Sequence, residues 1–264
     1  MLGIVSMIDY TAAAETYDNT RTHSDKVIDR FCAAASLDAS ASILDFGCGT
    51  GNYLSQIYRR FGCRCYGVEP SDAMRSQALS KPGLLQIVKG DHLAIPFPSE
   101  IFDFGYMTDV IHHVPDLRSM FRELLRVLKA SGLLCIVTES HSQIDARFYN
   151  RYFPSLAANE KRRYPDIEEV SARAGEIGFC AAATEAVSSP TGHISEGFLR
   201  NVAERNWSMF RLLSEDEFSH GLQALQRDRG RSFESPVAGE TLVWFRKVAQ
   251  PCAGGNPAPP RASA

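Results

Sequence analysis

The sequence predicts an α/β protein built on a doubly wound, mostly parallel β-sheet. Two observations lead to this fold class. Short apolar segments expected to form strands alternate with segments expected to form helices, as a sheet with helices on both faces requires. The first expected strand, residues 43–46, also runs directly into a glycine-rich turn. Many α/β proteins bind ligands at such a turn, outside the carboxyl ends of the strands.

Helices are expected at four places. The first covers residues 23–37, ahead of the first strand, and has an apolar face. The second covers residues 52–61, directly after the glycine-rich turn. Ser71 and Asp116 are good N-caps for the third and fourth helices, and Gly132 is expected to end the fourth.

The remaining strands are indicated by short apolar runs between these helices. They are expected at residues 64–69, 84–88, 101–107, 133–138, 179–187 and 240–248. The run at 133–138 is almost wholly apolar, which is typical of a central parallel strand buried on both faces.

One domain is enough to account for the length of the chain. The 264 residues, 44% of them hydrophobic, can bury one full α/β core. Residues 1–250 are therefore expected to form a single domain, with an N-terminal lid and helix in residues 1–40. Two insertions, residues 140–165 and 190–235, are expected on the side where a substrate binds. Residues 251–264, rich in Pro, Ala and Gly, are expected to be a disordered tail.

The insertion at 140–165 is unusually aromatic and follows an expected strand. It contains Phe148, Tyr149, Tyr152, Phe153 and Tyr164, together with Arg147 and Arg151. Two interpretations remain open: the segment walls a ligand site at the carboxyl ends of the strands, or it forms an amphipathic helix packed on the sheet.

Composition argues against several classes of partner. A net charge of -3 and a pI near 6.2 provide no general positive field, so nucleic acid is not an expected partner. No run approaches the ~20 apolar residues of a membrane span, and no secretory leader is recognisable. We therefore expect a soluble, cytoplasmic protein that does not bind membranes; the sequence leaves its oligomeric state open.

The cysteines indicate reduced thiols. There are seven of them, an odd number without the spacing of a disulfide framework. Cys63 and Cys65 share one face of an expected strand, and no neighbouring Cys or His completes a tetrahedral set. No metal site is expected.

The glycine-rich turn carries the clearest functional signal. Gly47, Gly49 and Gly51 allow the backbone to approach a ligand closely. Asp45 precedes the first glycine by two positions, and Glu69 ends the next expected strand. Nucleotide-binding α/β units place the acid that binds the ribose about 20 residues beyond the glycine-rich turn, which is where Glu69 lies.

Asp45 and the residues after the turn favour a cationic ligand over a dinucleotide. A dinucleotide site requires a third glycine inside the helix, yet positions 52 and 54 are Asn and Leu. A carboxylate ahead of the turn does not help to bind a pyrophosphate. It can pair with a ligand that carries an ammonium and a sulfonium group.

Two motifs, Asp-Phe-Gly-Cys-Gly-Thr-Gly at 45–51 and Gly-Val-Glu-Pro-Ser at 67–71, resemble those of the class I S-adenosylmethionine-dependent methyltransferases. The resemblance is greatest to the small-molecule branch that includes the enzymes of ubiquinone and menaquinone biosynthesis, and it covers about residues 40–140. It implies a Rossmann-like fold, S-adenosyl-L-methionine as cofactor, and methyl transfer to oxygen, carbon or nitrogen of a small-molecule acceptor.

The resemblance also implies a set of cofactor-binding residues. Asp45 and the loop residues Gly47, Cys48, Gly49 and Gly51 would hold the methionine end. Glu69, followed by Pro70, would take the ribose hydroxyls. The adenine would lie against Met74, Asp91 and His92, and the methionyl group would contact Thr108 and Asp109. An N-terminal lid would contribute Tyr17 and Arg21.

A catalytic base is less clearly indicated. His113 or His112 is the candidate, because an imidazole titrates near neutral pH. Adjacent helical residues point about 100° apart, so only one of the two is expected to face the site. The alternative is that the pair packs at the corner between strand and helix.

Three other functions remain as alternatives. An NAD-dependent oxidoreductase is disfavoured by Asp45 and by the missing third glycine. A protein that binds the cofactor without methylating is compatible with the same motifs. A metalloid methyltransferase would need thiols gathered at the acceptor site.

Overall fold

The computed structural model describes residues 23–81, 85–189 and 191–247. A seven-stranded sheet forms the centre, in the order β3-β2-β1-β4-β5-β9-β6. The strands along this order are Leu85–Val88, Arg64–Val68, Ser42–Phe46, Phe102–Thr108, Leu128–Thr138, Gly239–Lys247 and Phe179–Ser188. The pairs among β1 to β5 are parallel, and β9 runs antiparallel to both β5 and β6. The predicted doubly wound, mostly parallel sheet is confirmed.

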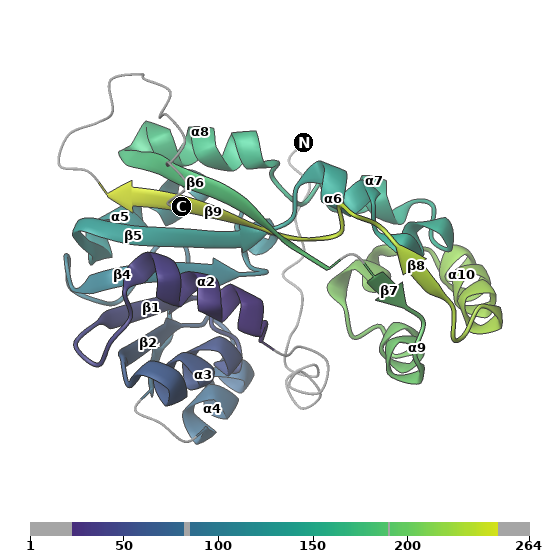
Figure 1. Ribbon diagram of the computed structural model, residues 1–264, viewed down its shortest axis with the longest axis horizontal. Helices are drawn as coiled ribbons and strands as arrows, with labels where there is room; N and C mark the ends of the chain where they lie inside the picture. The colour runs from purple at the N-terminus through teal and green to yellow at the C-terminus, as the bar shows by residue number, and fades with distance from the viewer. Residues whose placement is uncertain (1–22, 82–84, 190, 248–264) are drawn as a thin grey trace, which may run out of the picture.

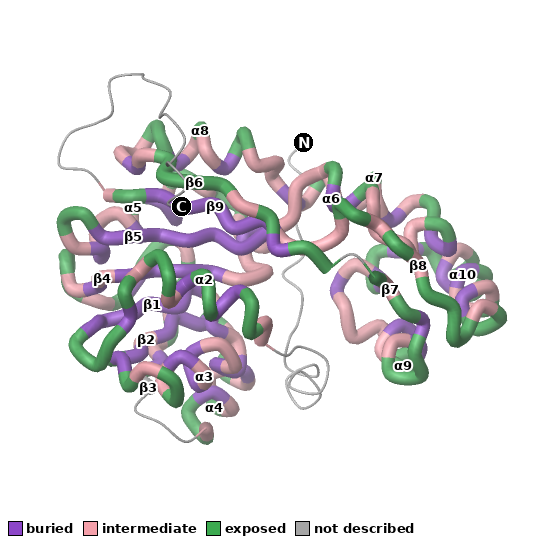
Figure 2. Tube along the Cα trace, viewed as in Figure 1, coloured by how far each residue is buried: buried purple, intermediate pink, exposed green. Residues whose placement is uncertain are grey.

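Helices cover both faces of this sheet (Figure 1). One face packs against α2 (Asp25–Ala35) and α3 (Asn52–Phe61), and the helix α4 (Asp72–Ser80) contributes Ala78 to the same cluster. The opposite face packs against α5 (Leu117–Val127) and α8 (Ile167–Ile177). The central strands between the two layers are buried along most of their length (Figure 2).

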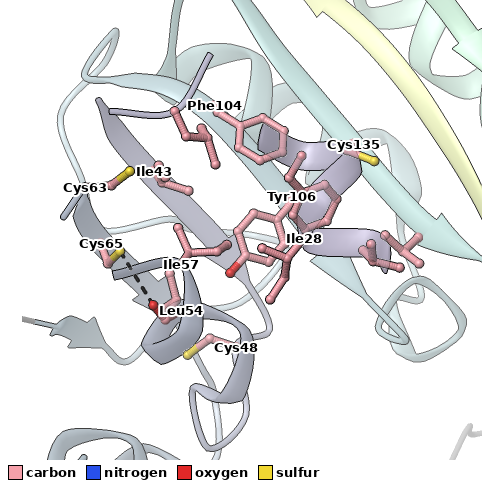
Figure 3. Packing of buried hydrophobic residues seen from close by; sticks show 14 of the residues in the cluster. Ile28, Ile43, Cys48, Leu54, Ile57, Cys63, Cys65, Phe104, Tyr106 and Cys135 are labelled. Atoms are coloured by element: carbon pink, nitrogen blue, oxygen red, sulfur yellow. Dashed lines mark hydrogen bonds between the residues drawn. The ribbon is translucent and has the colours of Figure 1, made fainter. Parts of the chain in front are cut away.

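The alternation of side chains along the strands explains the two layers. Ile43 belongs to the cluster on the α2 and α3 face, whereas its neighbour Leu44 belongs to the cluster on the α5 and α8 face, because successive side chains in a strand point to opposite faces. Figure 3 shows the first cluster, with Tyr106 and Phe104 of β4 beside Ile28.

The strand β5 begins earlier than the sequence predicted. The helix α5 ends at Val127, and β5 starts at Leu128, so the expectation that Gly132 ends this helix was wrong. The pairing of β5 with β4 explains the difference. Phe102 pairs with Leu128 and Phe104 with Leu133, so the residues between, Gly132 among them, sit in a register shift inside the strand.

A second body of structure, which we call the cap, lies beyond one end of the sheet (Figure 1). It comprises residues 141–161 and 191–234. Its elements are α6 His141–Asp145, η2 Phe148–Arg151, α7 Leu156–Lys161, β7 Thr191–His193, α9 Glu196–Ala203, η3 Ser208–Leu212, α10 Glu215–Arg227 and β8 Ser232–Glu234. The cap has its own apolar cluster, which joins Phe153 and Leu156 to Phe210 and Leu225. The two insertions identified in the sequence therefore pack on each other.

Within the described ranges, no helix is both long and apolar enough to cross a membrane. No group of three or more His, Cys, Asp or Glu side chains there is arranged to hold a metal ion. Among the cysteines that the structure describes, five carry free thiols, and Cys63 and Cys65 lie together in the core as expected. Cys180 is the exception to the prediction of reduced thiols, because its sulfur is disulfide-bonded.

Candidate functional site

The glycine-rich turn between β1 and α3 depends on positive φ angles in its backbone. Gly47, Gly49 and Gly51 all have positive φ, at 76°, 53° and 74°, a conformation that glycine adopts without steric cost. The N–H groups of Gly47 and Cys48 donate to the carbonyl of Val68 at 2.8 and 3.1 Å, which ties the turn to the end of β2.

Asp45, at the end of β1, is buried beneath this turn. Asp45 is 2% exposed, and its Oδ1 atom has no hydrogen-bond partner among the described residues. Burial raises the pKa of Asp45 to about 8; the nearby Tyr106 hydroxyl opposes this rise, and the charge of Glu69 adds to it. An unpartnered buried carboxylate is costly unless a ligand supplies a donor or a positive charge.

Glu69 reaches the same turn from the end of β2. Its carboxylate accepts from the N–H of Gly49 and from the N–H of Ser71, each at 2.9 Å. Burial raises the pKa of Glu69, and these two backbone donors oppose the rise. The residue is 8% exposed. A carboxylate held in this way keeps lone pairs for further donors such as hydroxyl groups.

Cys48 contributes its backbone to the turn, while its side chain packs behind it. A Cβ added at Gly67 would lie 2.6 Å from the Cys48 sulfur, so the thiol fills the space that Gly67 leaves open. Burial raises the pKa of this thiol well above its usual value. Cys48 is therefore a neutral packing group.

The other predicted residues near the turn lie at the same edge of the sheet, because Phe46 pairs with Val68 and Val68 with Val88. Met74 is buried in the first turn of α4, behind an exposed Pro70. Asp91, after β3, is exposed and accepts from the N–H of Leu93 at 2.8 Å; His92 beside it is half-buried.

Thr108 and Asp109 follow β4 at this edge and are half-buried. Asp109 has a φ of 56°, which is uncommon for a residue other than glycine and is most tolerated by Asp and Asn. Tyr17 and Arg21, the predicted lid residues, lie outside the described residues.

The two candidate bases differ in their surroundings. His112 is 7% exposed, and its ring stacks on Tyr164 with the centroids 4.1 Å apart and the planes 15° apart. His113 is half-buried, with its ring centroid 4.0 Å from that of His112. His112 therefore packs against a neighbouring ring, in line with the interpretation that the pair packs at the corner between strand and helix. Neither histidine is among the described residues that line the two cavities below.

A cavity of about 170 Å³, which we call the inner cavity, lies between the ends of β4, β5 and β9 and the cap. Its walls are Asp109, Glu139, Arg147, Tyr149, Glu160, Tyr164, Phe198, Trp207, Ser208, Met209 and Glu240. Tyr149 and Tyr164 of the aromatic segment thus face a cavity, whereas Tyr152 and Phe153 pack in the apolar cluster of the cap. Each of the two interpretations of that segment applies to part of it.

Arg147 organises the inner cavity, a role that the sequence pattern alone did not assign to it. Its guanidinium donates from Nε to Glu139 at 2.7 Å and from Nη1 to Glu160 at 3.2 Å. Glu160 also accepts from Arg163 at 2.6 Å. Burial raises the pKa of Glu139, and Arg147 opposes this rise. Two signals were available: Glu139 directly follows an expected strand, and Arg147 belongs to the aromatic segment that one interpretation places at the wall of a ligand site.

A larger cavity of about 610 Å³, the outer cavity, adjoins the inner one. The two share Glu139, Arg147, Tyr149, Phe198 and Glu240. Hydroxyl-bearing residues of the connections to the cap also line the outer cavity, namely Ser188, Ser189, Thr191 and Ser235. The two cavities therefore adjoin at the end of the sheet, and Asp109 is among the residues that line the inner one.

Comparison with known proteins finds a family match for the central segment. Residues 44–136 match the family described as "Methyltransferase domain". The chain is 31% identical over 147 residues to a probable chloroplastic tocopherol O-methyltransferase of Oryza sativa subsp. japonica, covering 52% of this chain and 41% of that protein. It is 27% identical over 183 residues to a sterol 24-C-methyltransferase of Pneumocystis carinii, covering 64% and 48%. The chain spans less than half the length of these two relatives.

Solved structures show the same fold. A putative methyltransferase from an antibiotic biosynthesis pathway of Anabaena variabilis has a TM-score of 0.70 at 21% identity, with 85% of this chain and 98% of that chain covered. The cyclase SpnF has a TM-score of 0.58 at 19% identity, with 86% and 82% covered. The fold is therefore the Rossmann-like fold of methyltransferases, and one neighbour with this fold is described as a cyclase.

Proposed function

We propose that this protein is an S-adenosylmethionine-dependent methyltransferase that acts on a small molecule. The observation that carries the proposal is Asp45, a buried carboxylate with an unpartnered oxygen beneath a glycine turn. A ligand with an ammonium group supplies the donor and the positive charge that this oxygen lacks. The methyltransferase match of residues 44–136 supports the same function.

The residues present fit this cofactor in several places. The turn of Gly47, Gly49 and Gly51 would admit the methionine end above Asp45. A Cβ at Gly47 would lie 2.6 Å from a methyl carbon of Val110, so this close approach requires glycine. Glu69 would accept from the ribose hydroxyls.

The rest of the predicted set would complete the site. Met74, Asp91 and His92 would contact the adenine, next to Pro70. Thr108 and Asp109 would contact the methionyl group. Tyr17 and Arg21 would close over it as a lid.

When bound, the cofactor supplies a methyl group attached to a positively charged sulfur. The protein's contribution is to hold the acceptor beside this group and to exclude water, which can account for much of the acceleration without a nucleophile from the protein. The inner cavity borders Asp109 and is the place for the acceptor. His113 is the proposed base for an acceptor that must lose a proton; since it lies outside the described lining of the inner cavity, the acceptor would have to extend beyond that lining to reach it.

We place the protein in the ubiquinone- and menaquinone-like branch of small-molecule methyltransferases, active in the cytoplasm. The relatives named for tocopherol and sterols support a small-molecule acceptor.

A non-methylating enzyme that keeps the cofactor is the second candidate. It is favoured by the cyclase SpnF, which shares the fold. A methylated product from any acceptor would exclude this candidate, and bound cofactor without product over a broad acceptor panel would support it.

The test is cofactor binding by two alanine variants. Asp45→Ala and Glu69→Ala should each abolish or severely weaken binding of S-adenosylhomocysteine in calorimetric titration, while their circular dichroism stays that of the wild type. Asp29→Ala, which removes an exposed carboxylate of α2, should bind like the wild type. Normal binding by both site variants would remove the basis of the proposal.

A further inference from the structure

Tyr106 of β4 carries a hydroxyl group inside the apolar cluster on the α2 and α3 face of the sheet. The residue is fully buried, and its hydroxyl has no hydrogen-bond partner among the described residues. Figure 3 shows its ring among the apolar side chains of this cluster. A buried hydroxyl without a partner lowers the stability of a protein. The ring of Phe104 stacks beside it, with the centroids 5.6 Å apart, so packing alone would favour phenylalanine at position 106 as well.

The Tyr106 hydroxyl lies on the same face of the sheet as the Asp45 carboxylate. The two residues pair in the register of β1 and β4. Each follows by two positions a member of another register pair, Ile43 and Phe104, whose side chains both belong to the cluster on this face. The hydroxyl is near enough to lower the pKa of Asp45, yet the Oδ1 atom of Asp45 has no partner either. The structure therefore places an unused donor beside an unused acceptor.

No other titratable group that interacts with Asp45, among the described residues, can serve in place of Tyr106. These groups are Glu69 and Cys65 of β2, Cys48 of the turn and Tyr53 of α3. None of them carries a positive charge, and the charge of Glu69 adds to the rise in the pKa of Asp45. Burial raises the pKa of both thiols and of the Tyr53 phenol, so these three groups stay neutral. The Tyr53 hydroxyl already accepts from the N–H of Ser24 at 3.1 Å.

We propose that Tyr106 is a positioning residue of the cofactor site, whose hydroxyl donates to the Asp45 carboxylate and directs it toward the ammonium group of S-adenosylmethionine. This inference rests on the proposed function. On binding, Asp45 releases its proton to solvent and becomes a carboxylate that accepts from the hydroxyl and pairs with the ammonium. Hydrogen bonds to a charged group are stronger than those between neutral groups. The hydroxyl that is costly in the apolar cluster thus stabilises the ionised form of Asp45.

Calorimetric titration of Tyr106→Phe with S-adenosylhomocysteine, which carries the same ammonium group, tests the effect on binding. The variant should bind at least about tenfold more weakly than the wild type. Its free energy of unfolding in urea should be unchanged or higher, because the substitution removes an unpartnered buried hydroxyl. Affinity equal to that of the wild type would overturn the inference.

Tyr66→Phe is the matched control. It removes a hydroxyl from a half-buried ring of β2 that packs with the cluster on the opposite face of the sheet. This variant should bind S-adenosylhomocysteine like the wild type. An equal loss of affinity in Tyr66→Phe and Tyr106→Phe would show that the loss does not depend on contact with Asp45, and it would overturn the inference.

The titration of Asp45 itself is a readout that a purely structural role of Tyr106 would not change. Carboxyl NMR of the protein with isotope-labelled aspartate follows this titration without any ligand, and Asp45→Asn identifies the signal. The midpoint should lie about one pH unit higher in Tyr106→Phe than in the wild type, because loss of a donor to the ionised form raises the pKa. Tyr66→Phe should leave the midpoint where it is.

The inference and the proposed function can fail separately. An unchanged Asp45 midpoint in Tyr106→Phe, with normal cofactor binding by the wild type, would overturn the inference alone. A wild-type chain that does not bind S-adenosylhomocysteine would contradict the proposed function, and the NMR titration would still decide whether Tyr106 donates to Asp45.

Discussion

Replacing Asp45 by asparagine removes one charge from the buried end of β1 and keeps the shape of the side chain. Burial raises the pKa of Asp45 to about 8, whereas the pKa of an aspartate in an unfolded chain is about 3.9. Because each tenfold change in an ionisation constant corresponds to about 1.4 kcal/mol, ionising Asp45 in the folded protein costs at most on the order of 6 kcal/mol more than in the unfolded chain.

The sign of the effect on stability follows from proton binding. Between about pH 4 and pH 8 the folded protein keeps a proton that the unfolded chain has released, so the free energy of unfolding falls as the pH rises through this window. Asp45→Asn has no proton to lose. After allowance for relaxation and water access, we expect the variant to be about 2 to 4 kcal/mol more stable than the wild type at pH 9 and nearly equal to it at pH 4.

Urea unfolding of the ligand-free proteins at the two pH values measures this difference. Asp103→Asn is the matched control. It changes a carboxylate of β4 that pairs with Lys129 at 2.7 Å and is 40% exposed, so it should be neutral or slightly destabilising at pH 9.

Ligand binding should show the opposite preference. A cationic ligand favours the ionised form of Asp45, so at pH 7 the wild type should release close to one proton on binding S-adenosylmethionine, measured by calorimetry in two buffers of different ionisation enthalpy. Asp45→Asn should release none and bind at least about tenfold more weakly. The reasoning would be refuted if Asp45→Asn had the same free energy of unfolding as the wild type at pH 9. It would also be refuted if Asp45→Asn bound S-adenosylmethionine with the same affinity and proton release as the wild type.

Two further substitutions test the turn and the inner cavity. Gly47→Ala places a Cβ 2.6 Å from Val110 and should lower the free energy of unfolding by about 1 to 3 kcal/mol more than Gly62→Ala does. Gly62 is the control, since it shares the positive φ but a Cβ there would have its nearest atom at 3.8 Å. Equal losses of stability in urea would contradict the close contact at Gly47. Arg147→Met leaves Glu139 and Glu160 without their shared partner and should lower the free energy of unfolding by about 3 to 5 kcal/mol in the same assay. A decrease of less than about 1 kcal/mol would mean that the buried carboxylates do not depend on Arg147.

The parts of the fold that could be predicted have local signals. The turn of Gly47 to Gly51 and its two acids lie within short motifs, and the strands around them are apolar runs. The helix α8 and the strands β7 and β8 were not predicted. Each strand of that pair has only three residues, which are exposed or half-buried, so no run of apolar residues marks them.

The parts of the candidate site that could not be predicted depend on distant contacts. Arg147 reaches Met209, 62 positions away in the sequence, and His112 stacks on Tyr164. No periodicity or spacing encodes such pairs, because they arise only when segments that are far apart in the chain pack against each other. For the same reason, the aromatic segment could not be divided in advance into residues that line a cavity and residues that pack in the cap.

Calorimetric titration of the wild-type chain with S-adenosylmethionine, S-adenosylhomocysteine and NADH tests the central claim most directly. The account predicts micromolar binding of the first two and no binding of NADH, because Asp45 favours a cationic ligand and the turn lacks the third glycine of a dinucleotide site. Binding of NADH alone would contradict it and would make the glycine turn a dinucleotide site.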